Sequence, residues 1–315
     1  MKNTIKSFVL FSTIIIAFTS CQTQGKKAPN KLLNNEIAIE QPATLEMSED
    51  SIIIKSQMKA MQKVKEAREK VATEAIQTIV KTQSAVQLLS TKNVSKATKQ
   101  LKEVSSEIEA IVKKYPKLDL LPIDVSVKTN DLITDISTVK QVTKDAEKAL
   151  KNEQLQEARA LLSKLTSEIN ITTVNVPLVT YPREIKRALK LIDQGKVSEA
   201  ETVLVTTLNA LVIEENKLPI PMLQAEVLID EAMARHLEDR TENSAIVINL
   251  LENADYQLKL AEVLGYGNKD KMYKELRNDI KLLKKSANSD KDLKELFNKL
   301  KLKVKTFRER LFLVS

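Results

Sequence analysis

The stretch DQGKVSEAETVL, residues 193–204, has the pattern of a tight turn followed by the start of a helix. Gly195 is suited to ending the preceding helix because glycine adopts a positive φ without steric cost, and Ala200 lets two helix axes approach closely. Two other segments align with this region: NVSKATKQLKEVSSEI (93–108) and QLQEARALLSKLTSEI (154–169) match KVSEAETVLVTTLNAL (196–211). The sequence therefore predicts repeated helical hairpins.

The alignment gives the three segments the same sequence of landmarks. An alanine is followed by a leucine four residues later and by a proline nineteen residues later. The proline stops the second helix of each hairpin, so each unit is predicted to end in an extended connector. We expect Asn93 and Asn152 to take the positive φ at the turns where glycine is absent. The aligned residues are Ala97, Ala158 and Ala200; Leu101, Leu162 and Leu204; and Pro116, Pro177 and Pro219.

The composition favours helices along the rest of the chain. Only 4 of 315 residues are glycine, while 43% are hydrophobic and 29% are charged. Residues 56–90 contain no glycine or proline and repeat apolar residues, Met61 among them, near the helical period. We therefore expect one long helix there, with these apolar residues facing the core. The spacing between the aligned alanines is uneven, which argues against a regular solenoid. We predict an all-α fold: an irregular array of helical hairpins closing into one globular helical body over 51–315, with a long N-terminal helix.

The C-terminal region, residues 268–315, is predicted to form a basic helical end. It contains 15 Lys and Arg against 7 Asp and Glu, and the net charge of the whole chain is +8. We expect its apolar stripe to cap the helical body, with a solvated basic face; anionic lipid headgroups or an acidic partner are the alternatives. The stripe consists of Leu293, Leu296, Phe297, Leu300, Val304, Phe307 and Leu311.

The N-terminal fifty residues are predicted to be an export signal and a tether. Residues 1–20 combine Lys2 and Lys6 with a short apolar run, which is typical of a signal peptide. FTSC (18–21) resembles the lipobox of bacterial lipoproteins, so we expect Cys21, the only cysteine, to carry a lipid. The polar segment 21–50 is predicted to be a flexible, lipid-anchored tether. No aspartate follows Cys21, so the expected location is the periplasm, anchored to the outer membrane.

The proline connectors supply the candidate binding surface. YPKLDLLPI, VPLVTYP and LPIPM present apolar side chains on backbone that cannot form a helix. They are expected either to pack over the helix ends or to form an exposed apolar strip for unfolded clients or another subunit. The candidate residues are Leu121, Pro122, Pro177, Tyr181, Pro182, Arg183, Pro219, Pro221 and Met222.

The chain has few residues that could carry catalysis. His236 is the only histidine and cannot form a multi-histidine metal site, and we expect it on a helix surface near Glu238 or Asp239. No phosphate-binding, dinucleotide-binding or hydrolase motif is present, so we predict no enzyme, no cofactor and no metal. Export would keep the basic C-terminus away from nucleic acid, and we expect no nucleic-acid partner.

Hairpins of the type ALKNEQLQEARALLSKL and ALKLIDQGKVSEAETVL, with the intervening TTVNVPLVTYP and NKLPIPM, resemble the YfdX family of bacterial envelope proteins. The resemblance covers about Tyr115 to Gly267 and can be extended from Gln57 to the C-terminus. Tetratricopeptide repeats rank second because the 34-residue period is missing. The YfdX resemblance implies an exported helical protein that forms homo-oligomers, with chaperone-like behaviour in envelope or acid stress.

The expected function is the binding of other envelope proteins or unfolded clients by a lipid-anchored protein. The alternative is a helical scaffold with a pocket for a small ligand or a cell-wall fragment. A pocket that brings together Tyr115, Tyr181, Arg183 and Arg187 would favour this alternative.

Overall fold

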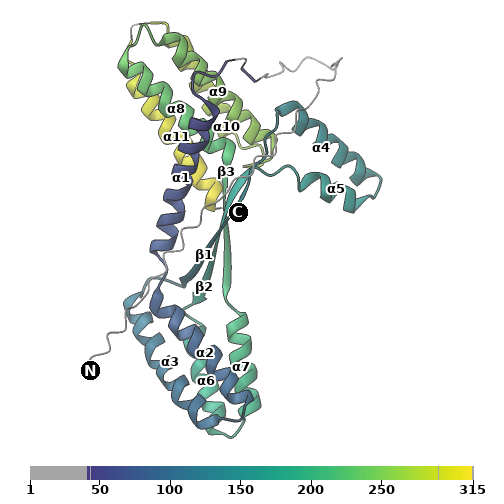
Figure 1. Cartoon of the computed structure of the whole chain (residues 1–315), viewed down its shortest axis with the longest axis vertical. Coiled ribbons are helices and arrows are strands. Elements are labelled where there is room, and N and C mark those ends of the chain that lie inside the picture. Colours follow the sequence, from purple (N-terminus) through teal and green to yellow (C-terminus); the bar gives the residue numbers. More distant parts are fainter. Residues whose placement is uncertain (1–40, 43, 290, 314–315) are drawn as a thin grey trace, which may run out of the picture. The chain divides into compact units, whose positions relative to one another are not determined.

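The computed structural model describes residues 41–42, 44–289 and 291–313. The predicted signal peptide, Cys21 and most of the predicted tether lie outside these residues. Within the described part, eleven helices and three strands follow one another as shown in Figure 1. The elements are α1 (Glu49–Glu69), α2 (Thr73–Ser90), α3 (Val94–Lys114), β1 (Leu120–Asn130), α4 (Ile136–Lys151), α5 (Leu155–Leu162), β2 (Glu168–Pro177), α6 (Tyr181–Asp193), α7 (Val197–Asn209), β3 (Val212–Pro219), α8 (Ile220–Glu238), α9 (Ser244–Val263), α10 (Met272–Ser286) and α11 (Lys294–Leu313).

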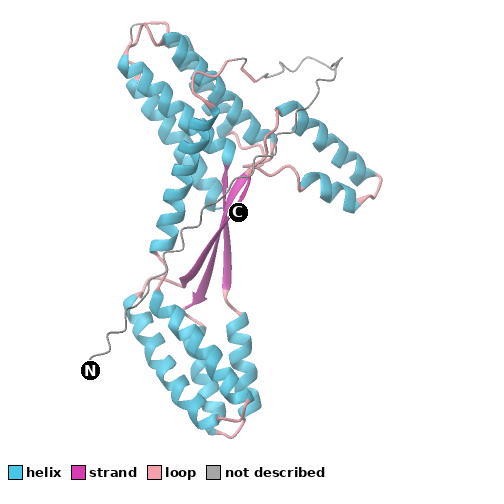
Figure 2. Cartoon of the chain, in the orientation of Figure 1, coloured by secondary structure: helices cyan, strands magenta, loops and turns pink. Residues whose placement is uncertain are grey.

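The fold class is confirmed as mainly α-helical, but the chain also forms three strands that pair with one another (Figure 2). β1 overlaps a predicted connector, whereas β2 and β3 lie before Pro177 and Pro219, where the second helix of the hairpin was expected to continue. The β2 sequence EINITTVNVP is rich in β-branched residues, which fit an extended, half-buried backbone. Proline at the C-terminal ends of β2 and β3 prevents a continuous helix from running through the strand into the helix that follows. Each of the three repeat units is therefore a helical hairpin followed by a strand.

The sheet has the order β1-β2-β3, with both pairs antiparallel. Leu120 pairs with Pro177, so β1 begins where β2 ends. Glu168 pairs with Pro219, so β2 begins where β3 ends. The hairpins that precede β1 and β3 consequently meet at one end of the sheet, while the α4–α5 hairpin enters from the other end.

The hairpins α2–α3 and α6–α7 form a four-helix bundle in which α2 packs on α7 and α3 packs on α6. The aligned alanines Ala97 and Ala200 are fully buried, as expected for positions where helix axes come close. The aligned leucines Leu101 and Leu204 are also fully buried in this core. The repeat seen in the sequence is thus a packing repeat.

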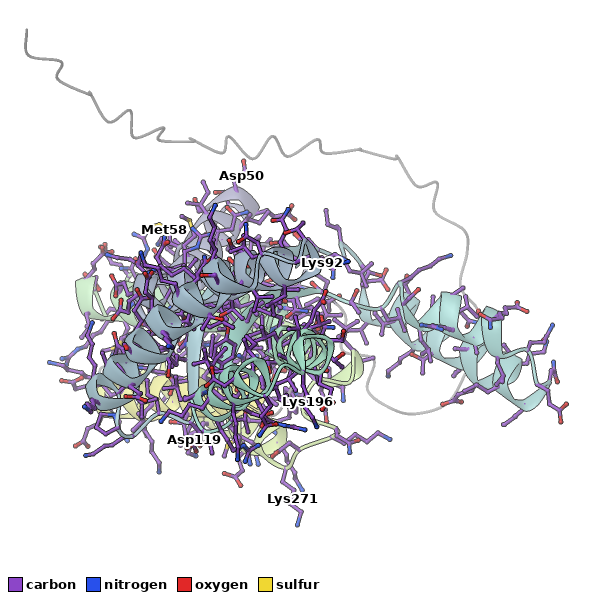
Figure 3. All side chains as sticks on the ribbon, turned by 90° about the horizontal axis from the view of Figure 1, so that it is seen from below. Asp50, Met58, Lys92, Asp119, Lys196 and Lys271 are labelled. Carbon is purple, nitrogen blue, oxygen red and sulfur yellow. The ribbon has the colours of Figure 1, made fainter. Side chains whose placement is uncertain are left out.

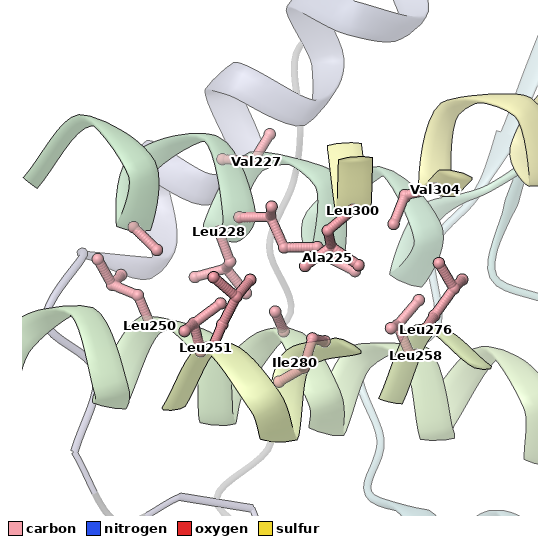
Figure 4. Close-up of a cluster of buried hydrophobic side chains, with 14 of the residues drawn as sticks. Ala225, Val227, Leu228, Leu250, Leu251, Leu258, Leu276, Ile280, Leu300 and Val304 are labelled. Carbon is pink, nitrogen blue, oxygen red and sulfur yellow. The ribbon is translucent and has the colours of Figure 1, made fainter. Parts of the chain in front are cut away.

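Helices α8 to α11 share a second core at the other end of the sheet (Figure 4). A short turn joins α8 to α9, and in it the Asp239 carboxylate accepts hydrogen bonds from the amides of Thr241 and Glu242. The predicted apolar stripe of α11 packs into this core, where Phe297, Leu300 and Val304 are fully buried. Residues on α8, α9, α10 and α11 fill the centre of Figure 4, including Leu228, Leu251, Ile280 and Leu300.

The predicted long N-terminal helix is wrong in one respect, because it is broken at Lys70–Ala72 into α1 and α2. The Ala72 amide donates to the Pro122 carbonyl at 2.9 Å, so the break joins the chain to β1. This tertiary contact replaces helical hydrogen bonds that the local sequence would have supported.

The predicted boundary of the folded part at residue 51 is too late. Met47 is buried, and Asn249 of α9 donates to the Thr44 carbonyl at 3.0 Å and accepts from the Glu46 amide at 3.1 Å. The end of the predicted tether is therefore part of the C-terminal core.

The hairpin turns confirm Gly195, whose φ is +75°, but not the two asparagines. The equivalent positions, five residues before each aligned alanine, are Lys92 and Glu153, with φ of 61° and 60°. Asn93 and Asn152 have ordinary negative φ. The turn geometry repeats while the residue type does not.

Candidate functional site

The structure divides the nine predicted connector residues between the two ends of the sheet. Pro122 and Pro177 lie at the bundle end, whereas Pro219 lies at the opposite end. Five of the nine are buried, because strand pairing and helix packing cover them. Of the two expectations for the connectors, packing over the helix ends agrees with this burial, whereas a single exposed strip does not. The buried five are Leu121, Tyr181, Pro219, Pro221 and Met222; Pro122, Pro177 and Pro182 are half-buried, and Arg183 is exposed.

Tyr181 illustrates why the connectors pack inward. Its hydroxyl donates to the Thr82 Oγ1 at 2.9 Å inside the bundle core. Burial raises the pKa of Tyr181 to about 12. The tyrosine therefore joins α6 to α2 and does not face solvent.

The four residues predicted for a small-ligand pocket do not converge. Arg183 and Arg187 both contact the Glu184 carboxylate, at 3.0 and 3.3 Å, and border a cleft of about 460 Å³. The hydrogen bond from Arg183 lowers the pKa of Glu184. The Tyr115 hydroxyl instead donates to Glu74 at 3.2 Å. Both arginines are thus paired with Glu184, and the two tyrosines make hydrogen bonds elsewhere, so the four residues form no common pocket.

An exposed apolar stripe on α1 is the surface that the sequence interpretation missed. Ile54, Met58 and Met61 are spaced by four and three residues, which places them on one face of the helix. They are 56%, 64% and 69% exposed, and Figure 3 shows Met58 at the outer surface of the helix. Met61 had been assigned to the core, and that prediction is wrong. We call these three residues the α1 stripe.

The opposite face of α1 fixes the helix to the body. Ile52, Ser56 and Ala60 are buried and belong to a separate face of the same helix. Ile52 joins the C-terminal core, while Ala60 contacts the cluster on the sheet. The burial of this face requires the α1 stripe to point outward.

A row of lysines holds α1 in this rotation. Lys55 lies 2.7 Å from Glu231 and Lys59 lies 2.7 Å from Asp230, both on α8. The hydrogen bond from Lys55 lowers the pKa of Glu231. With the helix oriented by ion pairs on one side and burial on another, the α1 stripe is displayed on a fixed element.

The chemistry of the α1 stripe suits contact with varied apolar surfaces. Methionine has three rotatable bonds and a polarizable sulfur, so it adapts to irregular partners. Three large apolar side chains on one exposed helix face are more than the scattered single residues normal on a soluble surface. The signal was present in the sequence as the spacing of Ile54, Met58 and Met61, but the same spacing also fits a buried face.

A cleft of about 770 Å³ lies where β2 begins and β3 ends. Its wall includes Glu168, which is only 6% exposed, and the Lys217 ammonium is 3.8 Å from that carboxylate. The Tyr266 hydroxyl accepts a hydrogen bond from the Ser167 amide at 3.0 Å. Burial raises the pKa of Tyr266, and the charge of Glu168 raises it further. A polar ligand group could be held here, whereas the lining offers no activated nucleophile.

His236 does not lie on the surface, so that prediction is wrong. It is 1% exposed, and its Nε2 accepts a hydrogen bond from the Leu293 amide at 3.2 Å. Burial lowers the pKa of His236, Arg240 lowers it further, and Asp292 opposes the shift. The neutral imidazole therefore joins α8 to the start of α11.

Several basic residues of the C-terminal region pair with acidic residues on other helices. Lys301 lies 2.8 Å from Asp230 and Arg277 lies 2.7 Å from Asp255. Arg308 lies 3.0 Å from Glu226 in a buried ion pair. These three ion pairs each join two helices of the C-terminal core.

Among the described residues, every helix falls short of the length or the apolar character that a membrane span requires. The same residues contain no group of three or more His, Cys, Asp or Glu side chains placed to hold a metal ion.

Comparison with known proteins gives one family match. Residues 75–217 match the family model described as YfdX protein, which spans the three hairpin-and-strand units from α2 to β3. Among solved structures, the chain is similar to that of Salmonella Typhi YfdX, with 12% sequence identity and a TM-score of 0.34. The similarity covers 48% of this chain and 93% of that chain. No curated protein matches the chain.

Proposed function

The chain belongs to the YfdX family over residues 75–217, and from that premise we propose that it acts without catalysis, by binding other proteins through the α1 stripe. The observation that carries this proposal is the exposure of Ile54, Met58 and Met61 on one face of a helix whose other faces are fixed. Burying such side chains against a partner stabilises the complex by roughly 25 cal/mol for each Å² of apolar surface removed from water.

Non-native proteins are the partners that this surface fits best. An unfolded client presents apolar segments of no fixed shape, and flexible methionine side chains can adjust to them. The acidic and basic residues beside the α1 stripe are already paired with one another, so they add little preference for one sequence. The expected activity is a chaperone-like protection of envelope proteins.

The cellular setting is part of the same proposal. Cys21 would carry the lipid and hold the protein at the outer membrane, facing the periplasm. It precedes α1, the first helix of the described residues, by 28 residues. A client-binding surface on that helix would work close to the membrane.

The test is to make the α1 stripe charged. Met58→Lys combined with Met61→Lys should abolish most of the suppression of aggregation of chemically unfolded lysozyme, because apolar contact is replaced by two solvated ammonium groups. The matched control is Leu237→Lys with Leu302→Lys, which charges two exposed leucines on α8 and α11. Equal loss in both variants, with native circular dichroism, would contradict a specific role for the α1 stripe.

A second candidate function is the binding of a small polar ligand in the cleft beside Glu168. It is favoured by the buried carboxylate and the volume of the cleft. A soluble muropeptide should then raise the Tm of the protein, and Glu168→Gln should remove the effect. Glu215→Gln, on the exposed side of β3, is the matched control. No shift in Tm would leave protein binding as the function to pursue.

A further inference from the structure

The cleft beside Glu168 is built from two parts of the chain. Glu168 and Lys217 come from the residues that match the YfdX family model, whereas the loop 264–270 and Arg310 lie beyond the match. With a volume of about 770 Å³, the cleft is large enough for a small organic molecule. Its chemistry follows from this chain's own residues, and the family match alone does not imply it.

The charged residues of the cleft differ in how far they reach the solvent. The Glu168 side chain is 8% exposed, whereas the side chains of Lys217 and Arg310 are 42% and 51% exposed. The carboxylate therefore lies inside the cleft, and the two basic groups lie at its mouth. A ligand meets negative charge inside and positive charge at the opening.

The contacts of Glu168 suit its carboxylate to a ligand cation. The Lys217 ammonium, 3.8 Å away, attracts the carboxylate but is too distant for a hydrogen bond. Burial raises the pKa of Tyr266 and keeps its hydroxyl protonated, so the hydroxyl can donate to Glu168. A carboxylate has about four acceptor positions, and a buried one needs a hydrogen-bonded partner of opposite charge. A ligand ammonium inside the cleft would supply that partner.

The basic groups at the mouth suit an anionic group of the same ligand. Arg310 lies 2.7 Å from Asp270, but a guanidinium has five N–H donors, and this ion pair uses only part of them. A zwitterion placed between Glu168 and Lys217 would give each of these charges an opposite partner. A simple amine or a simple anion would satisfy one of the two and be repelled by the other.

One wall of the cleft is apolar. Leu162 is 46% exposed, and Leu165 and Leu264 are half-buried, although all three line the cleft. Covering such side chains with an apolar chain removes them from water and is favourable. The fitting ligand is thus amphipathic, with its charges at one end and an apolar chain at the other.

The loop after α9 gives the cleft a preformed side. Gly265, Gly267, Asn268 and Lys269 all have positive φ, which is unfavourable for the two that carry a Cβ. Gly267 is pressed against α11, because an added Cβ would lie 3.0 Å from the Leu311 Cδ2. Packing on α11 therefore holds a strained backbone in place, and strain of this kind is concentrated at binding sites.

We infer that the cleft binds a zwitterionic amphiphile, a molecule with a primary ammonium, a nearby anionic group and an apolar chain. The ammonium contacts Glu168, and the anionic group lies between Lys217 and Arg310. The chain covers Leu162 and Leu165. A phosphoethanolamine headgroup with one acyl chain and a free apolar amino acid share this chemistry. The inference rests on the second candidate function, in which this cleft holds a ligand.

Glycine signals report occupation of the cleft directly, because the chain has only four glycines and two of them, Gly265 and Gly267, line it. The full chain carrying Cys21→Ser, which removes the predicted lipid, is labelled with 15N-glycine. Octanoyl lysophosphatidylethanolamine is added below its critical micelle concentration. The amides of Gly265 and Gly267 should shift to saturation, while Gly195, in the α6–α7 turn, should not. Equal shifts of all signals, or none, would overturn the inference.

A headgroup series tests the ammonium. Lysophosphatidylcholine of the same chain length has methyl groups in place of the N–H donors, and lysophosphatidylglycerol lacks the cation. Both should bind roughly tenfold more weakly or worse, because each loses the charge-assisted hydrogen bond to Glu168. Equal affinity for the three headgroups would count against a zwitterion site.

Variants separate a binding role of Glu168 from a structural one. Glu168→Gln should weaken lysophosphatidylethanolamine by roughly tenfold or more and leave lysophosphatidylglycerol unchanged. A purely structural role would change both alike. The matched control Glu215→Gln, exposed on β3, should bind both ligands like the parent chain. A Glu168→Gln variant that keeps the parent's preference for the ammonium would overturn the inference.

Free leucine distinguishes the two sources of this chemistry. It carries an ammonium, a carboxylate and a short apolar chain without a lipid headgroup. If leucine shifts Gly265 and Gly267 as readily as the lysolipid does, the ligand is a free amino acid, and if it binds much more weakly the ligand is a lipid headgroup. Either result supports the inference where binding depends on Glu168. Absence of binding by both probes overturns it.

The outcome is separable from the proposed functions. A muropeptide that raises the Tm, with no glycine shift from the lysolipid or from leucine, would keep the cleft as a ligand site and remove the amphiphile. Glycine shifts without a muropeptide effect would do the reverse. Glu168→Gln is expected to leave the suppression of aggregation through the α1 stripe unchanged.

Discussion

The two groups of four helices at the ends of the sheet reach similar burial by different means. The bundle of α2, α3, α6 and α7 has a core mainly of alanine, leucine and isoleucine, several of them from repeated positions, with one buried tyrosine, Tyr181, bonded to Thr82. The group α8 to α11 adds aromatic residues, a buried histidine and a buried ion pair between Arg308 and Glu226. In the bundle, small residues at repeated positions determine how closely the helices approach one another. In the C-terminal group, a buried ion pair and a buried histidine add specific contacts between helices. The two groups should therefore respond differently to mutation and to pH.

The largest expected effect is in the C-terminal group. Arg308→Met removes one partner of the buried ion pair and leaves the Glu226 carboxylate in the core, with the Lys59 ammonium 4.0 Å away. We expect a loss of about 3 kcal/mol or more in the free energy of unfolding. Urea denaturation gives the value, and replacement of both residues by Met and Leu should recover much of it. A loss no larger than that of a surface ion pair, about 1 kcal/mol, would contradict the importance of this contact.

The bundle should respond most to cavities. Leu101→Ala removes a fully buried side chain and should cost about 3 kcal/mol in the free energy of unfolding. Leu162→Ala, at the equivalent position of the α4–α5 hairpin, should cost much less because its side chain is already half exposed. Equal costs, measured by urea denaturation, would mean that the third hairpin is packed like the other two.

Acid should affect the C-terminal group through His236, the only histidine of the chain. Its pKa is lowered in the fold, so the unfolded chain binds the proton more readily. The contribution to stability is complete above the unfolded pKa of about 6.5 and is lost as the pH falls below that value toward the lowered pKa. Protonation also removes the acceptor for the Leu293 amide.

Urea denaturation of the parent chain and of His236→Gln, at a series of pH values from neutral to mildly acidic, measures this contribution. The parent should lose stability relative to the variant in that window. A difference that stays constant with pH would show that the histidine does not couple folding to acid.

The smallest effects are expected at the hairpin turns. Gly195→Ala places a side chain at a φ of +75° and should cost about 1 kcal/mol, although no atom lies within 4 Å of the added Cβ. Lys92→Gly, at the equivalent turn, should instead stabilise by a few tenths of a kcal/mol to about 1 kcal/mol. Thermal unfolding of both variants checks the signs. Changes of the same sign would mean that the two turns are not equivalent.

The limits of the sequence interpretation are physical ones. The α1 stripe was present as a helical spacing, but the same spacing serves a buried face, and only packing against α8 decides which face is buried. The prediction that the connector residues lie outside helices is correct for those in the strands and wrong for the rest, because proline is tolerated in the first turn of a helix. Leu121, Pro122, Pro177 and Pro219 lie in strands, whereas Tyr181, Pro182 and Arg183 begin α6 and Pro221 and Met222 begin α8. Their burial could not be deduced because it depends on which strands pair.

The sequence by itself determined the hairpin repeat, the turn at Gly195 and the apolar stripe of α11, because these depend on local periodicity and on the backbone preferences of single residues. Only the tertiary structure decided that β2 runs antiparallel between β1 and β3, and hence that two hairpins pair while α4–α5 does not. It also buried His236 and joined Arg308 to Glu226 across 82 residues. Local periodicity specifies which face of an element is apolar, whereas long-range packing specifies what covers it.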